Sequence, residues 1–493
     1  MRLAFYSGRP TTIFKPVKPC TCLLRRKVSH LAEVFAKAHP TFSLSSKDVT
    51  ILSEPRQFYK ALLDMVKRAR RRIFLSSLYI GTEETELIET LHRSLSLNSE
   101  VRLSLLLDLR RSTRPGPSTA HLLLPLLRAF PDRCEVRMFK SPKLRGLMER
   151  LVPRRFDEGW GTWHAKMYGV DDEVMFSGAN LNTSYFTDRQ DRYLHFSSQP
   201  DLAAYCLRFL HTFAQYSFRL LPTSSVSSSA YSPSEYALEW TNAACMFPHI
   251  VQHAERDILA LQSSHPPPPS VNTQADTHLR PVLQAGIFNI REEERLLPLL
   301  IRGAASQGRK LDLTSGYFAL HEPYQRAILK ARIPTRILAA GPKANGFYAS
   351  PGVSSRLPEA YTIAEHRFLS RARKAGLAGD HQTGEGEVLR LDEWEKEGWT
   401  YHAKGLWFSP VAGEQLPYAT LFGSTNLNSR SAQLDTELSF LLSTRSRELQ
   451  QALGREVQGL WEAGRRVDER DLDAAGRVRW GTRVLARVVG GML

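Results

Sequence analysis

The chain carries one short pattern twice, and this duplication limits its possible folds more than any other feature. The segment WHAKMYGVDDEVMFSGANLN in the first half is matched by YHAKGLWFSP and ATLFGSTNLN in the second. His164 and His402 are 238 residues apart, and Tyr79 and Tyr317, each 85 residues upstream, show the same offset. We therefore expect two copies of one domain.

The copies are separated by polar segments that cannot form a core. Stretches rich in Ser and Pro, PTSSVSSSAYSPS and HPPPPSVNTQADTH, are typical of linkers. The 493 residues leave room for two domains of about 200 residues each. The expected regions are a basic leader (1–40), a first domain (41–221), a linker region (222–281), a second domain (282–445) and a basic amphipathic tail (446–493).

Apolar periodicity indicates an α/β fold, a mixed sheet flanked by helices, in each copy. In the first copy, Phe58, Leu62 and Val66 share one face of an expected helix. Strands are expected over 73–79 and 101–107, with a helix over 84–93 between them. The Asp171-Asp172 pair should form the turn of a hairpin that follows the repeated pattern.

The repeated pattern brings together groups that suit phosphate chemistry. Alternate residues of a strand point to one face, so the His and Lys of each HAK project together, and the Asn of each NLN arrives at the end of the next strand. Lysine supplies positive charge and asparagine supplies donors, while one histidine can attack phosphorus and the other can transfer protons. The set comprises His164, Lys166, Asn180, His402, Lys404 and Asn426. No carboxylate or cysteine cluster has metal-ligand spacing, so we expect no metal and no cofactor.

These motifs resemble those of the phospholipase D superfamily, which read HxK, four residues, Asp, then GSxN. The first copy has Asp171 and SGAN, whereas the second has GSTN, including Ser424, but Ser409 where Asp is expected. The resemblance covers about residues 50–220 and 282–445. It implies two phospholipase D-like domains that share one active site at a pseudo-twofold interface, with Ser424 and the asparagines binding phosphate.

Longer segments resemble the eukaryotic phosphatidylglycerophosphate synthases: LLLDLRRSTRPG, LLPLLRAFPDRCEVRMFKSPKLRGL, SGANLNTSYFTDRQDRY and ANGFYASPGVSSRLPEAY. That family transfers phosphatidyl from CDP-diacylglycerol to glycerol 3-phosphate, a step towards cardiolipin. The resemblance implies that His164, Lys166 and Asp171 form the active site. It also implies nucleotide contact through Ile73, Phe74, Leu75, Ser76, Ser77, Leu78, Tyr79 and Ile80, for which a buried strand is the alternative interpretation.

The resemblance further implies a two-step reaction. His164 would attack the lipid-side phosphorus and release CMP, and His402 would take the proton from the acceptor hydroxyl. Asp191 and Glu437 each lie eleven residues after a motif asparagine and could fix a histidine tautomer. Pseudo-twofold symmetry predicts that they cross over, Glu437 to His164 and Asp191 to His402, and that the two imidazoles lie one phosphate bridge apart. A solvated or salt-bridged acid is the alternative.

The charge balance, 66 basic against 50 acidic residues, indicates an anionic partner. The basic-apolar stretches contain few aromatic residues that could stack on bases, so we expect a membrane surface rather than nucleic acid. Two segments could dock on a bilayer: 140–155, as an interfacial helix, and the tail from Arg477. A helix docked on its own domain is the alternative for both.

The first 32 residues hold seven Lys or Arg and no acid, which is typical of a mitochondrial targeting segment. A disordered basic terminus is the alternative. No apolar window is long enough for a spanning helix. Together with the resemblance, this implies a peripheral enzyme of the mitochondrial inner membrane. Another phosphatidyltransferase, such as a cardiolipin synthase, remains an alternative, as does a phosphodiesterase or nuclease.

Overall fold

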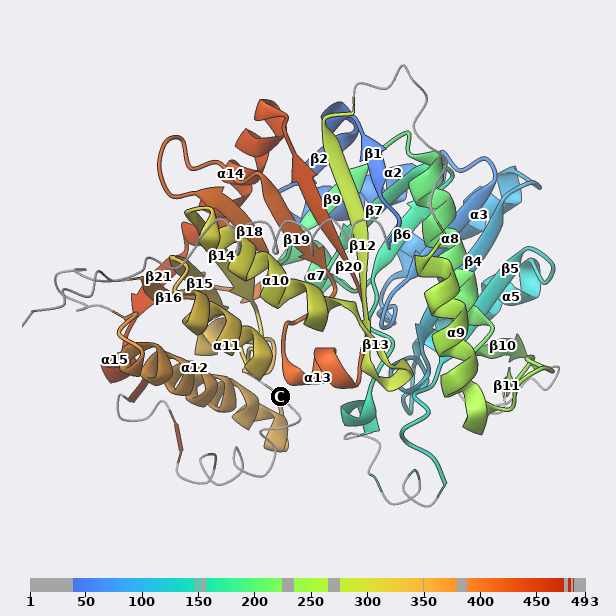
Figure 1. Ribbon diagram of the computed structural model, residues 1–493. Helices are drawn as coiled ribbons and strands as arrows, with labels where there is room; N and C mark the ends of the chain where they lie inside the picture. The colour runs from blue at the N-terminus through green and yellow to red at the C-terminus, as the bar shows by residue number, and fades with distance from the viewer. Residues whose placement is uncertain are drawn as a thin grey trace, which may run out of the picture.

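The computed structural model describes residues 39–146, 149, 152, 157–223, 235–264, 275–348, 350–378, 388–473, 478–479 and 482. Two large mixed sheets pack against each other in the middle of the molecule, and helices cover their outer sides (Figure 1). The first half of the chain forms most of one sheet and the second half most of the other.

The first sheet has nine strands, and its five central strands carry the first copy of the repeat. In spatial order they are β11 (Tyr236–Glu239), β10 (Phe218–Pro222), β5 (Cys134–Phe139), β4 (Arg102–Asp108), β3 (Arg72–Ser76), β6 (Met167–Val170), β7 (Glu173–Ser177), β9 (Tyr193–Phe196) and β2 (Val49–Leu52). Its outer helices are α2 (Pro55–Lys67), α3 (Thr85–Leu97) and α5 (Thr119–Ala129).

The second sheet repeats the spatial order of eight of these strands, read from β2 to β10, and has one further strand in front of them. It runs β1 (Phe42–Leu44), β12 (Thr277–Ala285), β20 (Thr436–Thr444), β19 (Ala419–Gly423), β18 (Lys404–Pro410), β14 (Arg309–Ser315), β15 (Thr335–Ala340), β16 (Leu389–Trp394) and β21 (Gly464–Val467), with β13 (Ile290–Arg291) beside β12. Its outer helices are α10 (Glu292–Ser306), α11 (Glu322–Ala331) and α12 (Leu357–Lys374). The expected duplicated α/β fold is confirmed.

Local sequence explains where these elements begin and end. Helix α2 starts at Pro55, since proline fits the first helical turn, and it buries Phe58, Leu62 and Val66 as expected. The expected strand over 73–79 ends earlier, at Ser76. The hairpin of β6 and β7 turns at Asp171, whose φ of 52° is a left-handed conformation that Asp tolerates.

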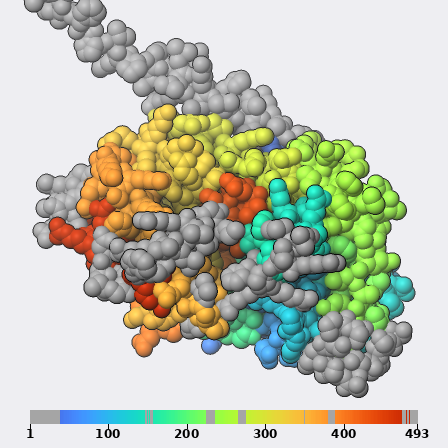
Figure 2. Space-filling model, turned by 90° about the horizontal axis from the view of Figure 1, so that it is seen from below, coloured from blue at the N-terminus to red at the C-terminus, as the bar shows by residue number. Residues whose placement is uncertain are grey.

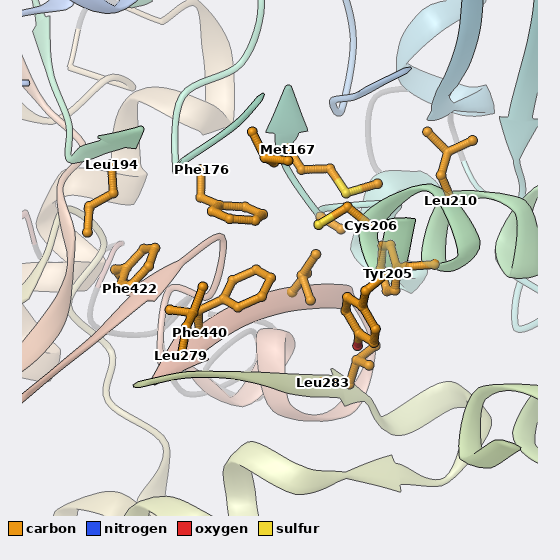
Figure 3. Close-up of a cluster of buried hydrophobic side chains, with 14 of the residues drawn as sticks. Met167, Phe176, Leu194, Tyr205, Cys206, Leu210, Leu279, Leu283, Phe422 and Phe440 are labelled. Atoms are coloured by element: carbon orange, nitrogen blue, oxygen red, sulfur yellow. The ribbon is translucent and has the colours of Figure 1, made fainter. Parts of the chain in front are cut away.

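A shared apolar core joins the two sheets (Figure 3). Phe176 of β7 and Phe440 of β20 pack with ring centroids 4.1 Å apart, and Phe196 stacks on Phe422 at 6.1 Å. Two helices, α8 (Pro200–Ala214) and α14 (Arg447–Trp461), flank this core. Seen from below, the two halves lie side by side with α13 (Ser429–Gln433) between them (Figure 2). Burial of this interface makes the halves one folding unit.

Three expected boundaries are wrong. Within the expected linker, β11 extends the first sheet and α9 (Ile250–Gln262) packs on α8, burying Ile250 and Ile258. Strand β1, expected in the first domain, pairs with β12 of the second sheet. The expected tail from 446 begins with α14 and β21, both integral to the second half. In each case apolar residues pack into a core whose other members lie elsewhere in the sequence.

Residues 1–38 of the expected leader lie outside the described residues. Of the expected interfacial helix, residues 140–146 form turns and loop with Leu144 buried, and most of the rest lies outside the described residues. At the start of the tail, the Arg479 N–H donates to the carboxylate of Glu359 on α12, and most of the remaining tail is outside the description. No helix in the described ranges is both long and apolar enough to cross a bilayer.

Candidate active site

His164 is held at the interface by the second half of the chain. Its backbone N–H donates to the carbonyl of Thr436 at 3.0 Å. Its Nδ1 lies 2.9 Å from both carboxylate oxygens of Glu437. Because a carboxylate only accepts, Nδ1 carries the proton and Nε2 keeps its lone pair.

His402 is held in the same way by the first half. Its N–H donates to the carbonyl of Gln190 at 2.8 Å, and Nδ1 lies 2.6 Å from Oδ2 of Asp191. Thr436 and Gln190 each stand one residue before the carboxylate that binds the histidine. The predicted crossover of Glu437 and Asp191 is therefore confirmed, and it follows pseudo-twofold symmetry.

The two lysines of the repeat are fully buried beside the histidines. Nζ of Lys166 donates to the carbonyl of His164 at 2.8 Å, and Nζ of Lys404 lies 3.4 Å from the Asp191 carboxylate. Burial, together with the charge of Lys404, lowers the pKa of Lys166 from 10.5 to about 7. The contact of Lys404, from the second copy, with Asp191 of the first places both copies in one site.

The charges of the site favour neutral histidines and ionised carboxylates. Burial alone would raise the pKa of Glu437, but His164, Lys166 and the Ser424 hydroxyl bring it to about 2. Burial lowers the pKa of His164 below 6.5, against the opposing effect of Glu437. Burial and the charge of Lys404 hold the pKa of His402 well below 6.5. Both imidazoles are thus bases at neutral pH.

The motif asparagines lie at the same site and keep free acceptor capacity. Oδ1 of Asn180 and Oδ1 of Asn426 are buried and accept no hydrogen bond from the described residues. Nδ2 of Asn180 lies 3.1 Å from the hydroxyl of Tyr185, which in turn is 3.4 Å from Nε2 of His402. A buried amide with an unmade hydrogen bond suits a ligand that completes it.

The first copy has SGAN where the second has GSTN, and this difference has a steric reason. A Cβ at Gly178 would lie 2.3 Å from Nζ of Lys404 and 2.7 Å from the Asp191 carboxylate, so a side chain there would displace both groups. At the equivalent place in the second copy, the hydroxyl of Ser424 donates to Glu437 instead. This serine is fully buried and orients the carboxylate, and its expected phosphate contact stays a prediction.

Asp171, expected in the active site, lies far from the histidines. It stands five residues after Lys166, about 16 Å along a strand that rises roughly 3.3 Å per residue. Its carboxylate accepts hydrogen bonds from the N–H groups of Arg70, Arg71 and Arg72 at 2.8, 2.9 and 3.1 Å. Asp171 therefore anchors the start of β3, and its assignment to the chemistry is wrong.

Most of the expected nucleotide strand is core. Ile73, Phe74, Leu75 and Ile80 are at most 1% exposed, and Ser76 donates to the carbonyl of Ala165 within the sheet. Ser77 is fully buried as well. In this stretch only Leu78 and Tyr79 keep partly exposed surface, and Arg111 covers the Tyr79 ring at 4.5 Å. Within this stretch, only Leu78 and Tyr79 are therefore accessible to a ligand.

Sequence comparison of the copies missed Tyr185 and Arg189, which have no counterpart of like chemistry in the second copy. The rings of Tyr185 and Tyr317 pack edge-on against the His402 imidazole, with centroids 5.1 and 5.4 Å away. Arg189 lies over the Tyr185 ring at 4.6 Å. Only their position in the sequence could have identified these residues, because Tyr185 and Arg189 lie between Asn180 and Asp191. Among the described residues, no group of three His, Cys, Asp or Glu side chains could hold a metal ion.

The fold and this site define the class of the protein: a duplicated α/β chain with two carboxylate-bound histidines at one interface. The crystal structure of phosphatidylserine synthase from Haemophilus influenzae shares the fold, with a TM-score of 0.70 at 18% identity over 94% of this chain and 97% of that one. No known protein-family model matches the chain.

Curated relatives are more specific. The CDP-diacylglycerol–glycerol-3-phosphate 3-phosphatidyltransferase of Schizosaccharomyces pombe is 34% identical over 463 residues, 85% of this chain and 89% of that protein. Mitochondrial proteins of the same name from Gallus gallus and Homo sapiens are also 34% identical, over 89% and 90% of this chain and 82% of each relative. The chain belongs to the CDP-diacylglycerol–glycerol-3-phosphate 3-phosphatidyltransferase family.

Proposed function

We propose that this enzyme transfers phosphatidyl from CDP-diacylglycerol to glycerol 3-phosphate, giving phosphatidylglycerophosphate and CMP. The observation that carries the proposal is the pair of neutral, carboxylate-oriented histidines at one interface, His164 on Glu437 and His402 on Asp191. Family membership supports the choice of substrates. The product is that of the committed step towards cardiolipin.

In the first step, Nε2 of His164 attacks the lipid-side phosphorus and the bond to CMP breaks. No described residue hydrogen-bonds to this nitrogen, whereas Nε2 of His402 already faces the Tyr185 hydroxyl. The resulting phosphatidyl-histidine carries a positive imidazole that Glu437 stabilises. CMP departs as a dianion, because the second pKa of a phosphate monoester is about 6.

In the second step, Nε2 of His402 takes the proton of the acceptor hydroxyl. The acceptor oxygen bonds to phosphorus, the bond to His164 breaks, and His402 returns the proton to solvent. Lys166 and Lys404 offset charge on the phosphoryl oxygens in both transition states. The amide groups of Asn180 and Asn426 complete the polar lining.

The setting we propose is the surface of the mitochondrial inner membrane, with the lipid reaching the site from an anionic bilayer. Relatives from chicken and human are named mitochondrial, and the chain has a net charge of +16. A cardiolipin synthase would use the same two-histidine chemistry with phosphatidylglycerol as acceptor, so the acceptor decides between the two functions.

The test uses purified protein, CDP-diacylglycerol and labelled glycerol 3-phosphate. We expect label in phosphatidylglycerophosphate, CMP release, and exchange of labelled CMP into CDP-diacylglycerol. His164→Ala should lose both release and exchange, while the control His92→Ala, an exposed histidine, keeps them. Transfer to phosphatidylglycerol but not to glycerol 3-phosphate would overturn the proposed function. Exchange that survives His164→Ala but not His402→Ala would reverse the two histidine roles.

A further inference from the structure

We propose that Arg189 binds the phosphate group of the acceptor and thereby selects a phosphorylated alcohol over an uncharged one. This inference rests on the proposed function and adds a specificity residue to it. Arg189 belongs to β8 (Arg189–Gln190), which pairs with β17 (Thr400–Tyr401) of the other half. It therefore sits at the same interface as the histidines.

The position of Arg189 beside His402 is set by three contacts. Its Nε donates to the Thr400 hydroxyl at 2.9 Å. Its guanidinium lies over the ring of Tyr185, and the same ring packs edge-on against the His402 imidazole. One aromatic ring thus separates the guanidinium from the proposed base.

The charge of Arg189 can be compared with that of its equivalent in the second copy, because the two copies are related by pseudo-twofold symmetry. The equivalent position in the second copy, 246 residues later, is Asp435. Its carboxylate accepts from the hydroxyl of Thr162 at 2.9 Å, just as Arg189 donates to Thr400, the equivalent of Thr162. The copies keep the histidine, lysine, asparagine and carboxylate but carry opposite charges here. The two sides of the site therefore suit different substrates.

The guanidinium of Arg189 differs from those of other interface arginines in its ion pairing. No described carboxylate forms an ion pair with Arg189. Other buried or partly buried arginines of the interface are paired: Arg430 with Asp435 at 3.1 Å and Arg192 with Glu456 at 2.8 Å. Burying an unpaired charge costs free energy, and pairing with a substrate anion would offset that cost.

A second donor faces the same place. A Cβ built on Gly346 would lie 3.1 Å from Nη2 of Arg189 and 3.1 Å from the Tyr317 hydroxyl. The guanidinium and this hydroxyl thus converge on one point, which the glycine leaves unfilled. Two converging donors, one of them charged, suit a phosphate oxygen.

The reaction geometry places the acceptor on this side. His164 holds the phosphorus on one face, so the acceptor hydroxyl must attack from the opposite face, where His402 takes its proton. In glycerol 3-phosphate, three carbons and one ester oxygen separate the attacking oxygen from the phosphorus of the phosphate. The phosphate can therefore reach past one aromatic ring to Arg189 while the hydroxyl stays at His402.

The test compares Arg189→Gln and Arg189→Lys with the wild type in three assays: transfer to glycerol 3-phosphate, transfer to glycerol, and CMP release to water. Arg326→Gln, which removes one charge from the exposed face of α11, is the matched control. We expect Arg189→Gln to lower kcat/KM for glycerol 3-phosphate by about ten- to a hundredfold, the effect of one charge-assisted hydrogen bond, mainly through KM. Arg189→Lys should recover part of the loss.

The other assays separate binding from folding. Transfer to glycerol and CMP release should change less than about threefold in Arg189→Gln, so the preference for the phosphorylated acceptor collapses. Equal losses in all three assays would overturn the inference, because Arg189 would then support His402 or the nucleotide. Unchanged transfer to glycerol 3-phosphate would overturn it as well. Failure of the wild type to use glycerol 3-phosphate would instead overturn the proposed function.

Discussion

Nδ1 of His164 lies 2.9 Å from both carboxylate oxygens of Glu437, a residue from the other half of the chain. Asp191 makes the same contact with His402 in the opposite direction. Each half therefore supplies a histidine that only the other half can orient. The duplicated chain has one site rather than two, and neither half is expected to act alone.

The first prediction concerns this exchange of carboxylates. Glu437→Gln should lower kcat by about 10²- to 10⁴-fold, since an amide can no longer hold the proton on Nδ1 of His164. Asp191→Asn should slow the acceptor step, with less effect on CMP exchange. Steady-state and exchange rates measure both. Ser424→Ala, which removes only one hydrogen bond to Glu437, serves as the milder comparison, and equal effects of all three variants would contradict the separate roles.

The second prediction concerns Asp171. Asp171→Ala should lower the free energy of unfolding by about 1–2 kcal/mol, because three N–H groups at the start of β3 lose their acceptor. Activity per folded molecule should stay within about threefold. Denaturant unfolding and kcat/KM measure the two effects. Asp171→Asn, which keeps an acceptor and tolerates the positive φ, should recover most of the stability; a well-folded but inactive Asp171→Ala enzyme would restore a chemical role.

The outcome for Asp171 shows where sequence reasoning reaches its limit. The repeat predicted the duplicated α/β fold, the His-Lys placement and the carboxylate crossover, because these follow from one strand geometry applied twice. It could not show that Asp171, five residues after Lys166, lies outside the site. Nor could it identify Arg189 and Tyr185, which have no counterpart of like chemistry in the second copy. Strand β1 and helix α9 were missed because their partners are distant in sequence.

The third prediction is the pH profile of kcat/KM. Lys166 must be protonated to offset phosphoryl charge; with its pKa near 7 in the free enzyme, raising the pH through 7 should lower the rate. His402 must be neutral to act as a base, and since its pKa lies well below 6.5 the acid limb should fall below pH 6.5. The optimum is thus near neutral to slightly acidic pH. If kcat/KM instead fell only near pH 10, Lys166 would have an ordinary pKa and the prediction would be wrong.

The fourth prediction is that a chelator leaves the chemical step intact. Lys166, Lys404 and the motif asparagines supply the charge and donors that a divalent ion would otherwise supply. Initial rates with EDTA should remain within about twofold of those without it, measured in detergent micelles so that ions do not alter lipid packing. Loss of CMP exchange in EDTA, with recovery on adding one divalent metal, would contradict the proposed mechanism.

The most direct test of the two-histidine account is to locate the covalent intermediate. His402→Ala enzyme is mixed with CDP-diacylglycerol, quenched under alkaline conditions that preserve phosphohistidine, and mapped by mass spectrometry. Because CMP can leave without a proton while the acceptor cannot attack without a base, we predict a phosphatidyl adduct on His164 that accumulates in this variant. The adduct should be absent from His164→Ala. An adduct on His402 in the His164→Ala enzyme, or full transfer by either variant, would contradict the account.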